Sequence, residues 1–212
     1  MAGPQIKICG INTPATLDAA IGARADHVGL VFYPPSPRYL SLPKAAELAA
    51  RAAGRIGKVG LFVDADDTTI AEAVGAAKLD ALQLHRSETP QRAAELGARF
   101  GVPVWKVIAV ASAADIARAG AYAGAANLIL FDAKTPKGTL PGGMGLVFDW
   151  ALLGAYRGAL PWGLAGGLSI DNVAEAVRAT GAPLVDTSSG VESAPGVKDV
   201  DKIVAFCKAA RP

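Results

Sequence analysis

The 212-residue sequence has little of several features that would each indicate a particular class of protein. It has two cysteines, too few for a disulfide scaffold or a CxxC zinc site. No uncharged apolar stretch reaches the roughly 18 residues of a membrane helix, and the first ten residues lack the pattern of a signal peptide. The 21 basic and 19 acidic residues are dispersed, so nucleic acid is not expected as a partner. We expect a cytoplasmic protein without a membrane or nucleic-acid partner.

Apolar residues are abundant, and their pattern alternates between two periods. Hydrophobic residues make up 51% of the chain, enough for one large core. Short apolar or β-branched runs alternate with alanine-rich stretches of helical spacing. Eight runs are predicted as strands: Gln5–Cys9, His27–Phe32, Gly57–Val63, Asp80–His85, Pro103–Ala109, Asn127–Asp132, Trp162–Ala165 and Leu184–Ser188.

Eight strands, each followed by a helix, predict an α/β fold of the TIM-barrel type. The expected architecture is one (β/α)8 domain over residues 1–212, with parallel strands inside and helices outside. A doubly wound open sheet is the alternative, but no GxGxxG motif follows the first run. Residues that favour helix starts are Thr13, Ser41, Asp67, Thr89, Ser112 and Ser169, and glycines near predicted helix ends are Gly22, Gly54, Gly75 and Gly181.

The first strand places a cysteine where barrel enzymes carry reactive groups. Side chains alternate along a strand, so Lys7 and Cys9 share one face and Ile6 and Ile8 the other. In a barrel Lys7 and Cys9 would point inward, with Cys9 at the C-terminal end. Cys9 is then a candidate base or nucleophile, and Lys7 could supply the positive charge that stabilises its thiolate. The alternative is an inert buried cysteine, the role we expect for Cys207.

Two aspartates also end predicted strands. Asp132 and Asp186 lie on the inward faces of the sixth and eighth runs. A carboxyl group in an apolar barrel mouth would have a raised pKa and could act as a general acid. The alternative is that each caps the loop that follows it.

Arg38 lies in a proline-rich loop after the second strand, at residues 33–39. Because prolines fix the backbone, the arginine could be held as a clamp on a carboxylate or phosphate. A solvated loop arginine is the alternative.

Loops after the seventh and eighth strands suit an anion. Gly166 and Gly167 follow the seventh, and Ser188, Ser189 and Gly190 follow the eighth. Phosphate sites at these two positions are common in TIM barrels.

The remaining glycine-rich segment and the two histidines do not point to one function. The segment 142–145 could be a lid, an anion loop or a plain turn before a helix near residues 148–150. We interpret His85 as a packing residue, although it could line the mouth, and His27 as structural. No cluster has metal-ligand spacing, so we expect neither metal nor cofactor.

Together these motifs resemble the phosphoribosylanthranilate isomerase family. The resemblance runs from residue 7 to about residue 199, in family order and spacing. Its segments are Lys7–Ile11, Asp26–Phe32, Ser36–Tyr39, Val59–Val63, Leu82–His85, Leu130–Asp132, Gly142-Gly143, Phe148–Trp150, Leu164–Leu168 and Val185–Glu192.

The resemblance implies a cofactor-free (β/α)8 isomerase of tryptophan biosynthesis. Its substrate would be N-(5-phosphoribosyl)anthranilate, converted to 1-(2-carboxyphenylamino)-1-deoxyribulose 5-phosphate by an Amadori rearrangement. Cys9 would be the general base, Asp132 the general acid, and Arg38 would bind the anthranilate carboxylate. The further substrate-binding residues implied are Gly166, Gly167, Ser188, Ser189 and Gly190 at the phosphate, and Asp186 near the sugar hydroxyls. The family includes monomers and dimers, so either a monomer or a homodimer is expected.

Two residues depart from the family pattern, and two rival functions stay open. Arg86 stands where a glycine is usual, and Met144 where a small hydroxyl residue is usual. One rival is the related phosphoribosyl isomerase of histidine biosynthesis, which would have an aspartate at the position of Cys9. The other is a non-catalytic phosphosugar-binding barrel, against which the set of Cys9, Asp132 and Arg38 argues.

Overall fold

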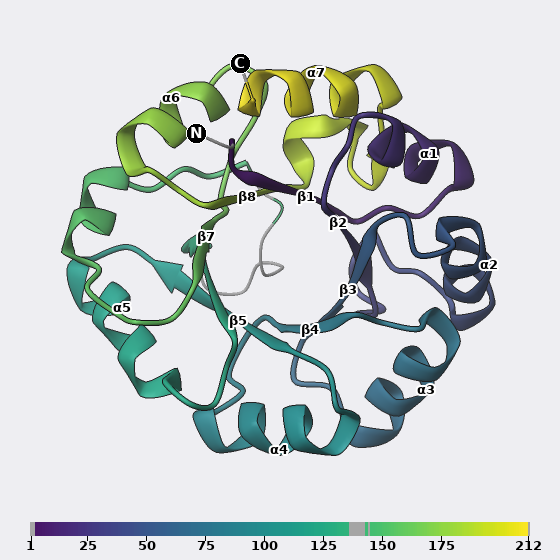
Figure 1. The fold of residues 1–212 in the computed structure, drawn as a ribbon, viewed down its shortest axis with the longest axis horizontal. Coiled ribbons are helices and arrows are strands. Elements are labelled where there is room, and N and C mark those ends of the chain that lie inside the picture. The colour runs from purple at the N-terminus through teal and green to yellow at the C-terminus, as the bar shows by residue number, and fades with distance from the viewer. Residues whose placement is uncertain (1–2, 136–142, 144, 212) are drawn as a thin grey trace.

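The structure, a computed structural model, describes residues 3–135, 143 and 145–211. Its centre is a closed barrel of eight parallel strands in chain order, in which β8 pairs back to β1 (Figure 1). The strands are β1 Gln5–Cys9, β2 His27–Val31, β3 Gly57–Phe62, β4 Ala81–Leu84, β5 Val104–Val110, β6 Leu128–Ala133, β7 Trp162–Leu164 and β8 Leu184–Thr187. The predicted TIM barrel is confirmed, and each strand boundary differs from the prediction by one residue at most.

Helices surround the barrel (Figure 1). They are α1 Pro14–Gly22, α2 Leu42–Ala52, α3 Asp67–Ala77, α4 Pro90–Phe100, α5 Ala113–Ala117, α6 Val173–Thr180 and α7 Val200–Ala210. The side chains of Thr13 and Thr89 cap α1 and α4, as their positions before proline predict.

Two predicted helix starts are wrong, and two of the four glycines near helix ends are not left-handed. The N-cap of α3 is Asp66, because its carboxylate accepts from the Thr69 N–H at 2.7 Å. The N-cap of α6 is Asn172 rather than Ser169. The backbone N–H of Ser169 donates to the side-chain oxygen of Asn172. Gly54 and Gly181 take left-handed conformations, but Gly22 and Gly75 are helical residues of α1 and α3.

The segments after β5 and β6 depart from a strict strand–helix alternation. Short α5 continues into the 3-10 helix η1 (Arg118–Tyr122), and the helix predicted near residues 148–150 is the 3-10 helix η2 (Trp150–Ala155). Asp149 caps η2 through a bond from the Ala151 N–H. Gly154 within η2 and Gly158 just after it disfavour a longer helix. Gly142 and Met144 lie outside the described residues.

The barrel interior is layered. Ile6 and Ile8 point outward and pack in the large core between strands and helices. An inner apolar cluster formed by Val59, Ala81, Trp105, Val107, Leu130 and Leu184 fills the part near the strand starts. Polar inward-facing residues, among them Lys7, Gln83 and Asp186, follow above it. The inner apolar cluster therefore closes the barrel at the N-terminal ends of the strands, and the polar groups lie toward the C-terminal ends.

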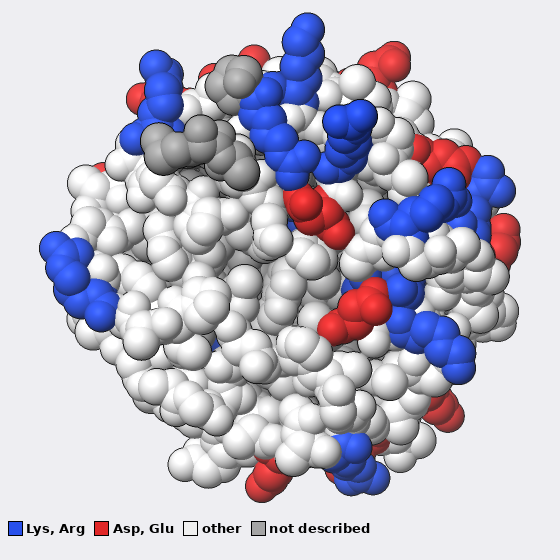
Figure 2. Space-filling view, in the orientation of Figure 1, with Lys and Arg blue, Asp and Glu red and all other residues white. Residues whose placement is uncertain are grey.

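The face that carries both termini is shown in Figure 2. Lysine and arginine side chains lie mostly around its edge, interspersed with acidic ones, and do not merge into one basic stripe. No helix in the described part of the chain combines the length and hydropathy required to cross a bilayer.

Candidate active site

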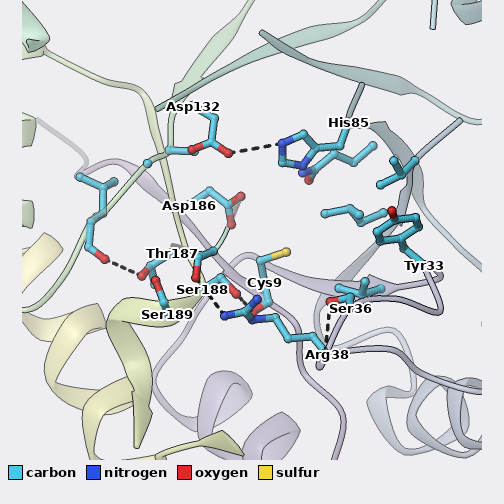
Figure 3. A pocket seen from close by; sticks show the side chains of 18 of the residues that line it. Cys9, Tyr33, Ser36, Arg38, His85, Asp132, Asp186, Thr187, Ser188 and Ser189 are labelled. Atoms are coloured by element: carbon cyan, nitrogen blue, oxygen red, sulfur yellow. Dashed lines mark hydrogen bonds and ion pairs between the residues drawn. The ribbon is translucent and has the colours of Figure 1, made fainter. Parts of the chain in front are cut away.

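A pocket with an empty volume of about 730 Å³ opens at the C-terminal ends of the strands. Its walls include most of the residues selected from the sequence: Cys9, Arg38, Asp132, Gly166, Gly167, Asp186, Ser188 and Ser189. Figure 3 shows the side chains of Cys9, Asp132 and Asp186 directed into one space. Gly190 is the exception. It lies behind the wall, where a methyl group in place of its hydrogen would be 2.0 Å from the Leu168 carbonyl oxygen.

Cys9 lies directly above a buried ion pair. Lys7 is fully buried, and its Nζ donates to both oxygens of Asp186 at 2.9 and 3.0 Å. Cys9 is paired with Gly29 of β2, and a methyl group on Gly29 would lie 2.7 Å from Cys9 Sγ and 3.1 Å from Lys7 Nζ. Gly29 thus makes room for the thiol and the ammonium group to converge. The structure places Lys7 beneath Cys9, as strand alternation predicts.

The electrostatics of Cys9 differ from the expectation. Burial raises the pKa of the Cys9 thiol, and the positive charge of Lys7 only partly offsets this. Burial alone would lower the pKa of Lys7, but the Asp186 carboxylate raises it above its ordinary value. Lys7 therefore stays charged, but its ion pair with Asp186 weakens its effect on the Cys9 thiol. Lys7 supplies the positive charge that the sequence indicated, but burial outweighs it and the pKa of Cys9 is raised.

Asp132 faces His85 across the pocket (Figure 3). His85 Nε2 lies 3.5 Å from Asp132 Oδ2. Burial and the nearby charge of Asp186 raise the pKa of Asp132 to about 7. Burial, with the positive charges of Lys106 and Lys7, lowers the pKa of His85 to about 4. At neutral pH a neutral imidazole therefore faces a carboxyl group that still holds much of its proton, which suits a general acid.

Sequence reasoning placed His85 in the packing, and the structure corrects this. His85 and Gln83 both line the pocket. Within the described part of the chain, His85 Nδ1 and Gln83 Oε1 are buried without a hydrogen-bond partner. Their alternation along β4 was the available signal, because both share the inward face. Arg86, which departs from the family pattern, points its side chain outward, and its backbone N–H donates to Glu88 at 3.0 Å.

Arg38 is buried and held by an acidic partner that the sequence analysis did not assign. Its Nε and Nη2 donate to Glu192 Oε1 and Oε2, each at 2.8 Å. Nη2 also donates to the carbonyl oxygen of Gly143 at 3.2 Å. Glu192 follows the loop after β8 and was visible only as part of the family motif. The reading of Arg38 as a solvated loop residue is therefore wrong.

The two predicted anion loops meet at the pocket and require their glycines. Gly166 has φ +87° and Gly167 φ +62°. A methyl group on Gly166 would lie 2.4 Å from the Ala133 nitrogen, and one on Gly167 2.6 Å from the Leu146 carbonyl oxygen. Across the pocket, the Ser188 hydroxyl donates to the carbonyl oxygen of Cys9 at 3.1 Å. This bond ties the end of β1 to the loop after β8.

Comparison with known proteins agrees with this geometry. The family model for N-(5'phosphoribosyl)anthranilate (PRA) isomerase matches residues 6–209. An N-(5'-phosphoribosyl)anthranilate isomerase of Paramagnetospirillum magneticum is 54% identical, with 98% of this chain and 97% of that protein covered. One of Cereibacter sphaeroides is 53% identical over the full length of both.

Solved structures give the same result. The phosphoribosyl anthranilate isomerase of Thermotoga maritima is 34% identical and superposes with a TM-score of 0.85, covering 98% of both chains. A structure of such an isomerase with reduced 1-(o-carboxyphenylamino)-1-deoxyribulose 5-phosphate is 32% identical, with a TM-score of 0.83 and 98% of both chains covered. The chain belongs to the N-(5'-phosphoribosyl)anthranilate isomerase family of tryptophan biosynthesis.

Proposed function

We propose that the pocket converts N-(5'-phosphoribosyl)anthranilate into 1-(2-carboxyphenylamino)-1-deoxyribulose 5-phosphate by an Amadori rearrangement, with Cys9 as base and Asp132 as acid. The main support is that one pocket holds a thiol and a carboxyl group whose pKa is raised to about 7. The ligand in the related structure is named as a reduced form of this product, so the same pocket in this chain is suited to a molecule of that size and charge.

The reaction needs one proton donor and one proton acceptor. The Asp132 carboxyl group protonates the ring oxygen of the ribose, the ring C–O bond breaks, and the anilino nitrogen lone pair forms the C=N bond of a Schiff base. The Cys9 thiolate then removes the C2 proton, and the electron pair of that C–H bond neutralises the iminium nitrogen to give an enolamine. Tautomerisation of the enolamine yields the ketone product. The steps balance with acid and base alone.

Two anion sites hold the sugar between the catalytic groups. Arg38 receives the anthranilate carboxylate, and the loops at Gly166-Gly167 and Ser188-Ser189 receive the phosphate. Gly190 shapes the second loop by its close packing on Leu168. Both carboxylate oxygens of Asp186 accept hydrogen bonds from Lys7, and their remaining lone pairs accept hydrogen bonds from the sugar hydroxyls. Fixing both ends of the substrate gives the proton transfers their geometry.

The pKa of Cys9 sets how much base is present. Because burial raises that pKa, the thiolate is a minor form of the free protein near neutral pH. The charge of Lys7 beneath it limits this penalty, so Lys7 supports the base without contacting substrate. The surroundings therefore favour the protonated form of Asp132, the acid, and disfavour the thiolate form of Cys9, the base.

Turnover can be measured directly. Freshly prepared N-(5-phosphoribosyl)anthranilate should lose its fluorescence on addition of the purified protein, without added metal or cofactor. Cys9→Ala should retain ligand affinity and lose about 10²- to 10⁴-fold in kcat, the usual contribution of a general base. Unchanged turnover in this variant would remove Cys9 from the mechanism. No decay with the folded wild type would remove the reaction itself.

Compartment and assembly are further parts of this proposal. We propose a cytoplasmic enzyme that works as a monomer or a homodimer. A related structure is described as coming from a dimeric isomerase of Thermotoga maritima, which supports testing both states. Sedimentation of the purified protein across concentrations distinguishes them.

A further inference from the structure

A chain of buried ionic contacts runs behind the pocket from Arg38 to Ser188. Glu192 Oε1 accepts from Arg38 Nε at 2.8 Å and from Lys198 Nζ at 2.6 Å. Lys198 Nζ also donates to the Ser188 carbonyl oxygen at 2.9 Å and contacts its hydroxyl at 3.1 Å. The Ser188 hydroxyl in turn donates to the carbonyl oxygen of Cys9. One carboxylate thus joins the arginine on one side of the pocket to the serine loop on the other.

This cluster is closed to solvent. The exposed fractions of the side chains are 11% for Arg38, 5% for Glu192 and 0% for Lys198. Burial acts to raise the pKa of Glu192, but the bond from Arg38 and the charge of Lys198 outweigh it and lower the pKa. Glu192 therefore stays ionised. Two cations around one anion leave one surplus positive charge beside the pocket, which favours an anionic ligand.

The contacts of Arg38 also orient its remaining donors. Within the described residues, the side-chain hydrogen bonds of Arg38 use Nε and Nη2. Because the Glu192 carboxylate takes the Nε–Nη2 edge of the planar guanidinium group, Nη1, which lies beside Gly143, is the nitrogen left without a hydrogen bond among the described residues. An unrestrained arginine loses side-chain entropy when it binds a ligand. Because Glu192 already holds Arg38 in place, this cost of binding is smaller.

We propose that Glu192 is a positioning residue that holds Arg38 for the carboxylate of the substrate, while Lys198 keeps its own bonds to Ser188. The inference rests on the proposed function of Arg38. Glu192 itself contacts neither the reacting atoms nor the ligand. Its effect is specific to the carboxylate end, so it can be separated from a general effect on folding.

Two ligands test this specificity. One is reduced 1-(o-carboxyphenylamino)-1-deoxyribulose 5-phosphate, and the other is the same compound without the carboxyl group. In Glu192→Gln, the Kd of the carboxylated ligand should rise by about 10- to 100-fold, the range expected when charge-assisted hydrogen bonds are lost. The Kd of the second ligand should change by less than about threefold. Titration calorimetry measures both.

Glu88→Gln is the matched control. Glu88 is another buried carboxylate paired with a buried lysine, with Oε2 at 2.8 Å from Lys106 Nζ. Within the described residues, none of the hydrogen bonds of its carboxylate reaches Arg38. The variant should lose stability as Glu192→Gln does, yet keep the preference for the carboxylated ligand. Urea unfolding of both variants confirms that the comparison is made on folded protein.

Arg38→Met separates failure of this inference from failure of the proposed function. If Arg38→Met keeps the preference for the carboxylated ligand, Arg38 does not bind the carboxylate and that part of the function is wrong. If Arg38→Met loses the preference and Glu192→Gln keeps it, only the positioning role is overturned. Equal weakening of both ligands in Glu192→Gln, or tighter binding of the carboxylated one, also overturns it. Tighter binding would mean that Glu192 competes for Arg38.

Discussion

The imidazole of His85 lies 3.5 Å from the carboxyl group of Asp132, and the two groups have pKa values shifted in opposite directions. Burial lowers the pKa of His85 to about 4 and raises that of Asp132 to about 7. A neutral histidine cannot draw the proton from Asp132 by its charge. Burial and the charge of Asp186 therefore keep Asp132 available as an acid at a pH where aspartate is ordinarily ionised, and the neutral imidazole beside it does not oppose this.

The pH dependence of turnover should show Asp132 on the acidic side. The proposed mechanism requires Asp132 protonated and Cys9 ionised, and the pKa of Cys9 is the higher one. Below pH 7 the thiolate fraction grows with pH, so kcat/KM rises. Between the two pKa values the gain in thiolate cancels the loss of acid, so kcat/KM is level, and above the Cys9 pKa it falls.

Asp132→Asn tests this assignment. The variant should lose about 10²- to 10⁴-fold in kcat. Its residual kcat/KM should continue to rise with pH through 7, because the proton that produced the level region is gone. Steady-state kinetics from pH 5 to 9 measure this. A break that persists near pH 7 in the variant would assign it to another group.

The same variant should be more stable than wild type in alkaline solution. The folded pKa of Asp132, about 7, exceeds its ordinary 3.8, so the wild type loses stability as pH rises through this window. Asparagine carries no such proton. The stability advantage of Asp132→Asn should therefore grow by about 3 kcal/mol between pH 5 and pH 8, two pKa units of linkage. Urea unfolding at both pH values measures it, and a constant difference would contradict the raised pKa.

His85 should affect kcat through the orientation of Asp132. In His85→Leu we expect a loss of about tenfold or more in kcat, because misplaced reacting groups slow proton transfer. His85→Gln retains a polar group on this face and should lose less. His85 is already neutral between pH 5 and 7, so neither substitution removes a group that titrates there, and the pH profile in this range should not change. A loss confined to KM would instead indicate that His85 contacts the ligand alone.

The ion pair of Lys7 and Asp186 should make Lys7→Met strongly destabilising. Both side chains are buried, so the single change leaves an unpaired carboxylate and should cost about 3–5 kcal/mol. The double variant Lys7→Met/Asp186→Leu removes both charges and should recover part of that loss. It should not recover turnover, because Cys9 has lost the adjacent positive charge. Chemical unfolding and kinetics on the three proteins measure this, and a double variant less stable than Lys7→Met would contradict the pairing argument.

Gly166→Ala should disturb Asp132 as well as the loop. The added methyl group would lie 2.4 Å from the Ala133 nitrogen and 3.0 Å from Asp132 Oδ1, at a residue with φ +87°. We expect a loss of about 1–3 kcal/mol in stability and a large loss in kcat. Gly181→Ala is the control, since its φ is +65° and nothing lies within 4 Å of the new methyl group. It should lose stability alone; equal kcat losses would contradict the site-specific reading.

The barrel could be predicted from local patterns because its elements are governed by short-range rules. Period-two alternation placed Ile6 and Ile8 outward and Lys7 and Cys9 inward, and threonine before proline started two helices. Where local signals were balanced, as at Ser169 and Gly75, the prediction failed. The helix predicted near residues 148–150 is instead the 3-10 helix η2, where Gly154 disfavours a regular α-helix.

Most of the candidate residues that line the pocket could also be selected from the sequence, since barrels place function at strand ends and the motifs stand in family order. Their electrostatics could not be predicted in this way. The direction of the Cys9 pKa depends on how deeply β1 is buried and on how much of the Lys7 charge Asp186 takes up. The partnership of Arg38 with Glu192 joins residues 154 positions apart, and His85 meets Asp132 only because β4 and β6 close into one barrel. Alternation along a chain decides which face a side chain occupies, whereas distances and dielectric surroundings exist only once the strands have closed.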